Sequence, residues 1–117
     1  MKDNAYLRTI AENMDENTTV SSLQKYVDEM VNIRGFADET PQDALLLLTE
    51  ELGELAKEVR KSHTRIKNDP AKGHTDNLKG EVGDVFMMLL ALCRTLDIDL
   101  VEAFKEKELI NCDRIWE

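Results

Sequence analysis

The chain of 117 residues is 42% hydrophobic and 33% charged, which indicates a single globular domain and excludes a disordered protein. Its 15 Lys and Arg against 24 Asp and Glu give a net charge of -9, and so acidic a surface repels the phosphates of a nucleic-acid polymer. The longest uninterrupted apolar run, Val85 to Cys93, is far shorter than the roughly 18 residues that span a bilayer, so we expect no membrane contact.

The two cysteines and the first residues indicate the compartment. Cys93 and Cys112 fit no metal-binding pattern, and polar sequence follows Met1 in place of an apolar export segment. We therefore expect reduced thiols in a cytoplasmic protein. Because Cys93 lies in the apolar run, it is expected to pack in the core.

The chain begins with polar sequence and then becomes periodic. Residues 1–17 predict a polar arm or a short helix, and residues 18–117 predict the folded domain. From Val20 to Val31 apolar side chains recur at steps of three and four, which predicts an amphipathic helix that ends at Gly35.

The signal for the start of the next helix is strong, because Thr40 as N-cap is followed by Pro41 and by an acid at Asp43. This helix is expected to run to about Lys61, and residues 62–74 are expected to form a loop.

Two further helices are predicted after the loop. One begins near Thr75 or Asp76 and continues to about Leu96, and the next opens at Asp99 and runs through about Cys112. The chain shows no alternating run long enough to predict a strand. The sequence therefore predicts an all-α, four-helix-bundle-like domain, or a half-bundle that a second copy completes.

Five carboxylates border the most apolar helical stretches. Glu50, Glu51 and Glu54 follow four leucines in succession, and Glu81 and Asp84 precede the apolar run. Stretches that are apolar all round are expected to be buried. Glu51 and Glu54 lie about 60° apart on one helical face, and the other pair makes the same step.

Carboxylates that converge beside buried turns need a counter-charge, because each resists desolvation and repels the others. A hard divalent cation supplies it, so the sequence predicts a site for Mg²⁺, with Mn²⁺ as a second choice. A di-iron site would need Glu-x-x-His, and the only histidines, His63 and His74, lie in the predicted loop. The competing interpretation is a non-catalytic helical partner-binding protein with a solvated acidic face.

The pattern Glu50-Glu51-x-x-Glu54, then 26 residues, then Glu81-x-x-Asp84 resembles that of the MazG-like all-α nucleoside triphosphate pyrophosphohydrolases. The lead-in Arg34-Gly-Phe and Thr40-Pro-Gln-Asp is also similar. The resemblance covers roughly residues 20–116. It implies oligomerisation and Mg²⁺-dependent hydrolysis of (deoxy)nucleoside triphosphates to the monophosphate and pyrophosphate. Dimeric dUTPases and phosphoribosyl-ATP pyrophosphatases are related alternatives that the resemblance does not separate.

The resemblance also implies roles for single residues. The metal ligands would be Glu51, Glu54, Glu81 and Asp84. Glu50 would hold a second metal or would orient or deprotonate the attacking water, and Glu50 and Glu54 are the candidate catalytic residues.

Candidate substrate-binding residues surround these acids. Lys57 extends the acid stripe, Lys79 belongs to a locally basic segment, and Lys107, Asn111 and Arg114 match a pattern at the end of the family's domain. Asn77 and Met88 share a helical face with Glu81 and Asp84, as the i, i+4, i+7 and i+11 spacing shows. Met88 stands where family members often have tyrosine, which leaves the preferred base open. The expected partners are a nucleotide and further copies of the chain, as a homodimer or a dimer of dimers.

Overall fold

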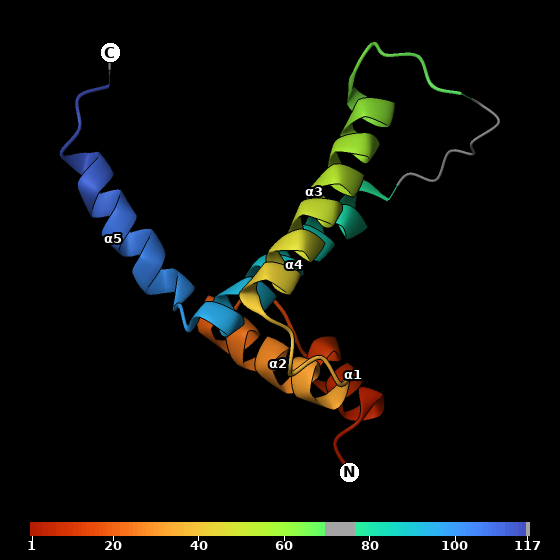
Figure 1. Cartoon of the computed structure of the whole chain (residues 1–117), viewed down its shortest axis with the longest axis vertical. Helices are drawn as coiled ribbons and strands as arrows, with labels where there is room; N and C mark the ends of the chain where they lie inside the picture. The colour runs from red at the N-terminus through yellow and green to blue at the C-terminus, as the bar shows by residue number, and fades with distance from the viewer. Residues whose placement is uncertain (70–76, 117) are drawn as a thin grey trace.

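The computed structural model describes residues 1–69 and 77–116, and the regular elements among these residues are helices (Figure 1). The all-α class is confirmed, and the described residues contain no strand. The helices are α1 (Asn4–Glu12), α2 (Val20–Ile33), α3 (Pro41–His63), α4 (Leu78–Leu96) and α5 (Leu100–Cys112).

Local start signals set two of the helix boundaries. Thr40 caps α3 in a reciprocal capping box, in which its hydroxyl accepts from the Asp43 amide at 3.1 Å and the Asp43 carboxylate accepts from the Thr40 amide at 2.9 Å. These bonds lower the pKa of Asp43. Asp99 caps α5 by accepting from the Glu102 amide at 2.9 Å. The predicted start of α4 at Thr75 or Asp76 lies outside the described residues, and the described helix begins after Asn77.

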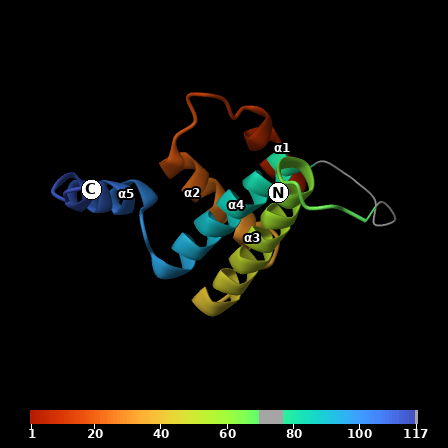
Figure 2. The ribbon, with the colours of Figure 1, turned by 90° about the horizontal axis from the view of Figure 1, so that it is seen from above.

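The helices form an open arrangement. α3 and α4 lie side by side and antiparallel, and α2 packs against α4 near the end where α3 begins (Figures 1 and 2). α1 packs on α2. α5 contacts α2 and then extends away from α3 and α4 in both views. A single chain therefore does not close a four-helix bundle.

The core lies where α1, α2 and α4 meet. Leu7 of α1 is buried there together with Val27 and Met30 of α2 and Leu90 of α4. Residues 4–12 thus form a short helix that contributes to the core. Cys93 is also buried, as expected for core packing.

The expectation that the leucine run is buried is wrong for the single chain. Leu45 and Leu46 of α3 are more than half exposed, and α3 buries only Ala44 and Glu58. The reason is that α3 packs chiefly against α4, so its other faces meet no second layer. Trp116 near the carboxyl terminus is exposed, and its indole N–H donates to the Asn111 carbonyl at 3.3 Å. Among the described residues no helix combines the length and apolarity that crossing a membrane needs.

Candidate metal centre

One stripe of α3 side chains faces α4. Positions 44, 48, 51, 55, 58 and 62 follow one another at steps of four and three, so they share one face of the helix. Ala44 and Glu58, the two buried residues of α3, both belong to this stripe, and Glu51 lies midway between them. Glu51 is therefore placed at the seam between α3 and α4 and not on the outer surface.

Three carboxylates meet at this seam. Glu51 of α3 and Glu81 and Asp84 of α4 each offer an oxygen, and these oxygens all lie within 4.8 Å of one another. Glu51 and Glu81 are half-buried, whereas Asp84 is exposed at the edge of the seam. The predicted convergence of the two Glu-containing motifs is thus present for three of the five acids.

The carboxyl of Glu81 has a raised pKa. Burial raises the pKa of its carboxyl, and the charges of Asp84, Glu51, Glu54 and Glu58 raise it further. Its Oε2 is buried and has no hydrogen-bond partner among the described residues. A buried carboxylate oxygen without a partner is costly, and a bound cation or a proton would relieve that cost.

The donor set fits a hard divalent cation. Mg²⁺ takes carboxylate oxygens in octahedral geometry and keeps several water ligands, which substrate phosphates replace. Glu51, Glu81 and Asp84 supply only oxygen donors, and the exposed side of Asp84 leaves room for water or a phosphate. Mn²⁺ accepts the same ligands.

Glu54 and Glu50 lie beside this triad and not within it. Glu54 is exposed, yet its charge contributes to the raised pKa of Glu81, so it borders the site. Glu50 is exposed on the same flank of α3, about 40° around the helix from Glu54. The structure therefore groups three predicted metal ligands and leaves Glu54 at the edge.

Sequence reasoning missed Glu58. It is 8% exposed, and its Oε1 lies 3.6 Å from the Nζ of Lys61. Its charge also raises the pKa of Glu81, so Glu58 lies on the side of α3 that faces α4. The signal was present in the sequence, because Glu58 follows Glu51 by seven residues and so repeats its position on the helix.

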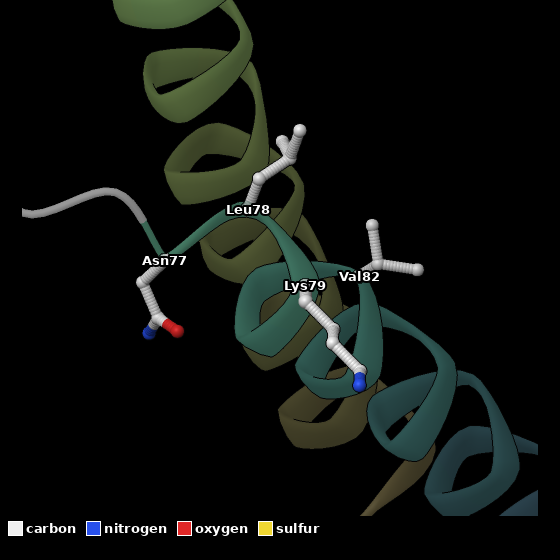
Figure 3. Close-up of a pocket in the computed structure, with 4 residues that line it drawn as sticks. All are labelled: Asn77, Leu78, Lys79 and Val82. Carbon is white, nitrogen blue, oxygen red and sulfur yellow. The ribbon is translucent and has the colours of Figure 1, made fainter.

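Asn77 and Lys79 lie at the amino-terminal end of α4. They line an open hollow of about 570 Å³ together with Leu78 and Val82. Figure 3 shows the Asn77 amide and the Lys79 ammonium pointing away from the two apolar side chains. Asn77 occupies the N-cap position without a side-chain capping bond, so its amide is not committed to closing the helix end.

The remaining predicted residues are dispersed. Lys57 is exposed on α3, and Met88 is partly buried and packs against the core. Lys107 and Asn111 lie on α5 and Arg114 lies just beyond its end. Both views show α5 extending away from α3 and α4, the helices that carry the five acids (Figures 1 and 2). The Arg114 guanidinium lies 4.7 Å from the centre of the Trp116 ring.

Comparisons with known proteins show which family this chain belongs to. A family model of the MazG nucleotide pyrophosphohydrolase domain matches residues 39–108, which include all five predicted acids. The chain is 37% identical over 87 residues to YpjD of Bacillus subtilis (strain 168), an uncharacterized protein, covering 73% of this chain and 76% of YpjD. It is also similar to the crystal structure of YpjD from Bacillus subtilis, a candidate pyrophosphatase, with a TM-score of 0.72 and 31% identity over 86% of this chain and 100% of that one.

Proposed function

Since the chain belongs to the MazG nucleotide pyrophosphohydrolase family, we propose that it hydrolyses (deoxy)nucleoside triphosphates with Mg²⁺, or Mn²⁺, to the monophosphate and pyrophosphate. The observation that carries this proposal is the convergence of Glu51, Glu81 and Asp84 within 4.8 Å at the α3–α4 seam. In this role the enzyme removes unwanted nucleotides from the cellular pool.

Glu51, Glu81 and Asp84 would hold the cation, with Glu54 beside them at the edge of the seam. A cation bound there would supply positive charge where negative charge develops on the phosphate oxygens. Glu50 orients a water molecule and accepts its proton as the water oxygen attacks the α-phosphorus. The bond from that phosphorus to the bridging oxygen breaks, and pyrophosphate leaves.

The substrate lies along the seam toward the start of α4. There Lys79 and Asn77, whose amide makes no capping bond, are the phosphate contacts from α4, and Lys57 is the contact from α3. Met88 lines the inner end of this nucleotide site. Since α5 extends away from the acids of its own chain, Lys107, Asn111 and Arg114 contact a nucleotide held by another copy.

The proposal includes a homodimer or a dimer of dimers in the cytoplasm. Both cysteines are free thiols, Cys93 buried and Cys112 exposed, which suits a reducing compartment.

The test is pyrophosphate release from a panel of ribo- and deoxynucleoside triphosphates, with Mg²⁺ or with excess chelator. We expect release by the wild-type protein with Mg²⁺ and its loss in Glu81→Gln, while Glu106→Gln on the exposed face of α5 keeps full activity. Release from dUTP alone would indicate a dUTPase, and release from phosphoribosyl-ATP alone would indicate that substrate class. No release from any of these by folded protein would refute the enzyme and favour a non-catalytic binding protein.

A further inference from the structure

The direction of α5 depends on contacts near its amino-terminal end. Every residue of α5 lies in the described part of the chain, and none of them is buried. Its main contact is with α2, and its first residue, Leu100, packs against the core, whereas Phe104 is 74% exposed. The rest of the helix extends away from α3 and α4 in both views (Figures 1 and 2). The contacts that hold the start of α5 therefore decide where its far end lies.

A small change of direction at Leu100 becomes a large displacement at the far end of α5. At a rise of about 1.5 Å per residue, Cys112 lies about 18 Å from Leu100, and a tilt of about 10° moves it by about 3 Å. A hydrogen bond between nitrogen and oxygen tolerates only a few tenths of an ångström around its usual length of about 2.9 Å. Asn111 and Arg114, at this end, can keep a fixed place only if the start of α5 is held.

One side chain of α2 holds that start on both sides of Asp99, the residue that caps α5. The Nε2 of Gln24 donates to the Ile98 carbonyl at 2.9 Å, and its Oε1 accepts from the Leu100 amide at 3.0 Å. The first amides of a helix have no acceptor within the helix itself. Gln24 therefore supplies the acceptor for such an amide from a different helix, and it stands 76 positions earlier in the chain.

The end of α4 is also held by α2. Asp97 closes α4 with a left-handed backbone, at a φ of 53°. Close to this turn the Arg94 Nε donates to the Asp28 Oδ1 at 2.8 Å. Asp28 follows Gln24 by four residues, so the two side chains project from the same side of α2. One residue of α2 thus holds the end of α4, and the other holds the start of α5.

The turn between α4 and α5 requires both a donor and an acceptor from position 24. The Ile98 carbonyl needs a donor and the Leu100 amide needs an acceptor, and a glutamine amide supplies both. A glutamate in its place would still accept from the Leu100 amide, but it would bring a second oxygen to the Ile98 carbonyl. Asp97 and Asp99 flank Ile98 in the sequence, and their negative charges would add to the cost of a further carboxylate.

We propose that Gln24 is a positioning residue, which fixes the direction of α5 and thereby places the nucleotide contacts on and just beyond that helix. This inference rests on the proposed function, which assigns those contacts to Lys107, Asn111 and Arg114. Gln24 lies on α2 and takes no part in the acid triad of α3 and α4. Its loss should therefore weaken nucleotide binding and leave the chemical step unchanged.

The first test is the hydrogen exchange of single backbone amides, measured by NMR in wild type, Gln24→Met and Gln24→Glu. Methionine keeps the length of the side chain and removes both hydrogen bonds, whereas glutamate keeps the acceptor. We expect the Leu100 amide to exchange at least about tenfold faster in Gln24→Met and to stay protected in Gln24→Glu. The Glu102 amide, which donates to Asp99 at 2.9 Å, is the internal control. Equal exchange of the Leu100 amide in wild type and Gln24→Met overturns the proposal.

The second test is the distance between two spin labels, measured by double electron–electron resonance. One label is placed on the exposed Cys112 and the other on Lys25→Cys of α2, while the thiol of Cys93 is buried. Labelled chains are diluted into unlabelled ones, so that each distance belongs to a single chain. In Gln24→Met we expect the distances to shift or spread by about 3 Å or more, as a tilt of about 10° would produce. Gln42→Met, the same substitution at an exposed position of α3, should leave them unchanged. Unchanged distances in Gln24→Met overturn the proposal.

The third test separates binding from chemistry in the release of pyrophosphate. For Gln24→Met we expect the KM for the nucleotide to rise about tenfold while kcat stays within about twofold, because the acids are untouched. Gln42→Met should keep both constants. An unchanged KM, or a fall in kcat alone, overturns the positioning role.

The exchange and distance measurements use neither a nucleotide nor a metal, so they decide whether Gln24 directs α5 whatever the activity of the protein. A wild-type protein that releases no pyrophosphate would refute the proposed function. A wild-type protein that is active, with unchanged exchange and distances in Gln24→Met, would refute the role of Gln24 alone.

Discussion

Glu58 and Lys61 form an almost enclosed ion pair beside the acid triad. Their charged atoms lie 3.6 Å apart, and the side chains of Lys61 and Glu58 are only 12% and 10% exposed. The charge of Glu58 also raises the pKa of Glu81 across the α3–α4 seam. Lys61, which pairs with Glu58, therefore places a positive charge at the end of a site whose other charged groups are carboxylates.

Breaking this pair from one side should destabilise the protein. Lys61→Met leaves the Glu58 carboxylate buried without its counter-charge, and we expect a loss of about 3 kcal/mol in the free energy of unfolding at pH 7. The double variant Glu58→Gln/Lys61→Met should recover most of that loss, because no buried charge remains. Urea unfolding measures both, with the exposed Lys67→Met as control. Equal losses in the single and double variants would contradict the paired arrangement.

The raised pKa of Glu81 predicts a pH dependence of the metal-free protein. In the folded chain Glu81 holds its proton more tightly than in the unfolded chain, so the folded state binds more protons above the ordinary glutamate pKa of about 4.3. This contribution to stability is present below that pH and is lost as pH rises through the higher folded pKa.

Thermal unfolding in chelator across pH 4 to 8 measures this, as the difference between wild type and Glu81→Gln. We expect Glu81→Gln to gain stability relative to wild type as pH rises. Added Mg²⁺ should reverse the order at neutral pH, because it binds only the wild-type triad. A stability difference between the two proteins that stays constant across this pH range would show that the pKa of Glu81 is not raised.

Metal binding and turnover should depend on different acids, the triad for binding and Glu50 for turnover. Glu51→Gln, Glu81→Gln and Asp84→Asn each remove a ligand oxygen, and we expect at least about a tenfold loss of Mn²⁺ affinity by calorimetry or electron paramagnetic resonance. Glu50→Gln should keep the affinity within about twofold while turnover falls about a hundredfold, as for a lost general base. Loss of Mn²⁺ binding in Glu50→Gln would assign Glu50 to the metal instead.

The short helix α1 should be needed for stability. Leu7 is 1% exposed and belongs to the core shared with α2 and α4, so Leu7→Ala should lower the free energy of unfolding by about 3 kcal/mol. Arg8→Ala, on the exposed side of the same helix, should have little effect. Equal stability of the two variants would show that residues 1–17 are dispensable.

Mixing two inactive variants tests whether α5 serves the nucleotide of another copy. Glu81→Gln lacks the metal ligand, and Lys107→Ala/Arg114→Ala lacks the α5 cations. After subunit exchange each mixed dimer has one intact site, so an equal mixture should recover about a quarter of wild-type activity. A variant that carries all three substitutions, mixed with wild type, should recover none beyond that of wild-type dimers. No recovery in the first mixture would remove α5 from the nucleotide site.

The helix starts and the acid pattern were readable from the sequence because both depend on near neighbours. The Thr40 and Asp99 caps need only a side chain and an amide three residues on, and the structure confirms both. The spacing of Glu51, Glu81 and Asp84 on helical faces predicted their convergence once the two helices packed together.

The other features of the fold and of the site depend on which helices pack against each other. Burial of Glu58, exposure of Leu46 and the outward course of α5 depend on which faces of the helices meet, and apolar residues all around a helix do not say which face is covered. The sequence by itself determined the elements and the acid set, through local hydrogen bonds and helical periodicity. Only the tertiary structure decided which of those acids lie close together and which apolar face stays exposed on the single chain, because both depend on contacts between segments far apart in the chain.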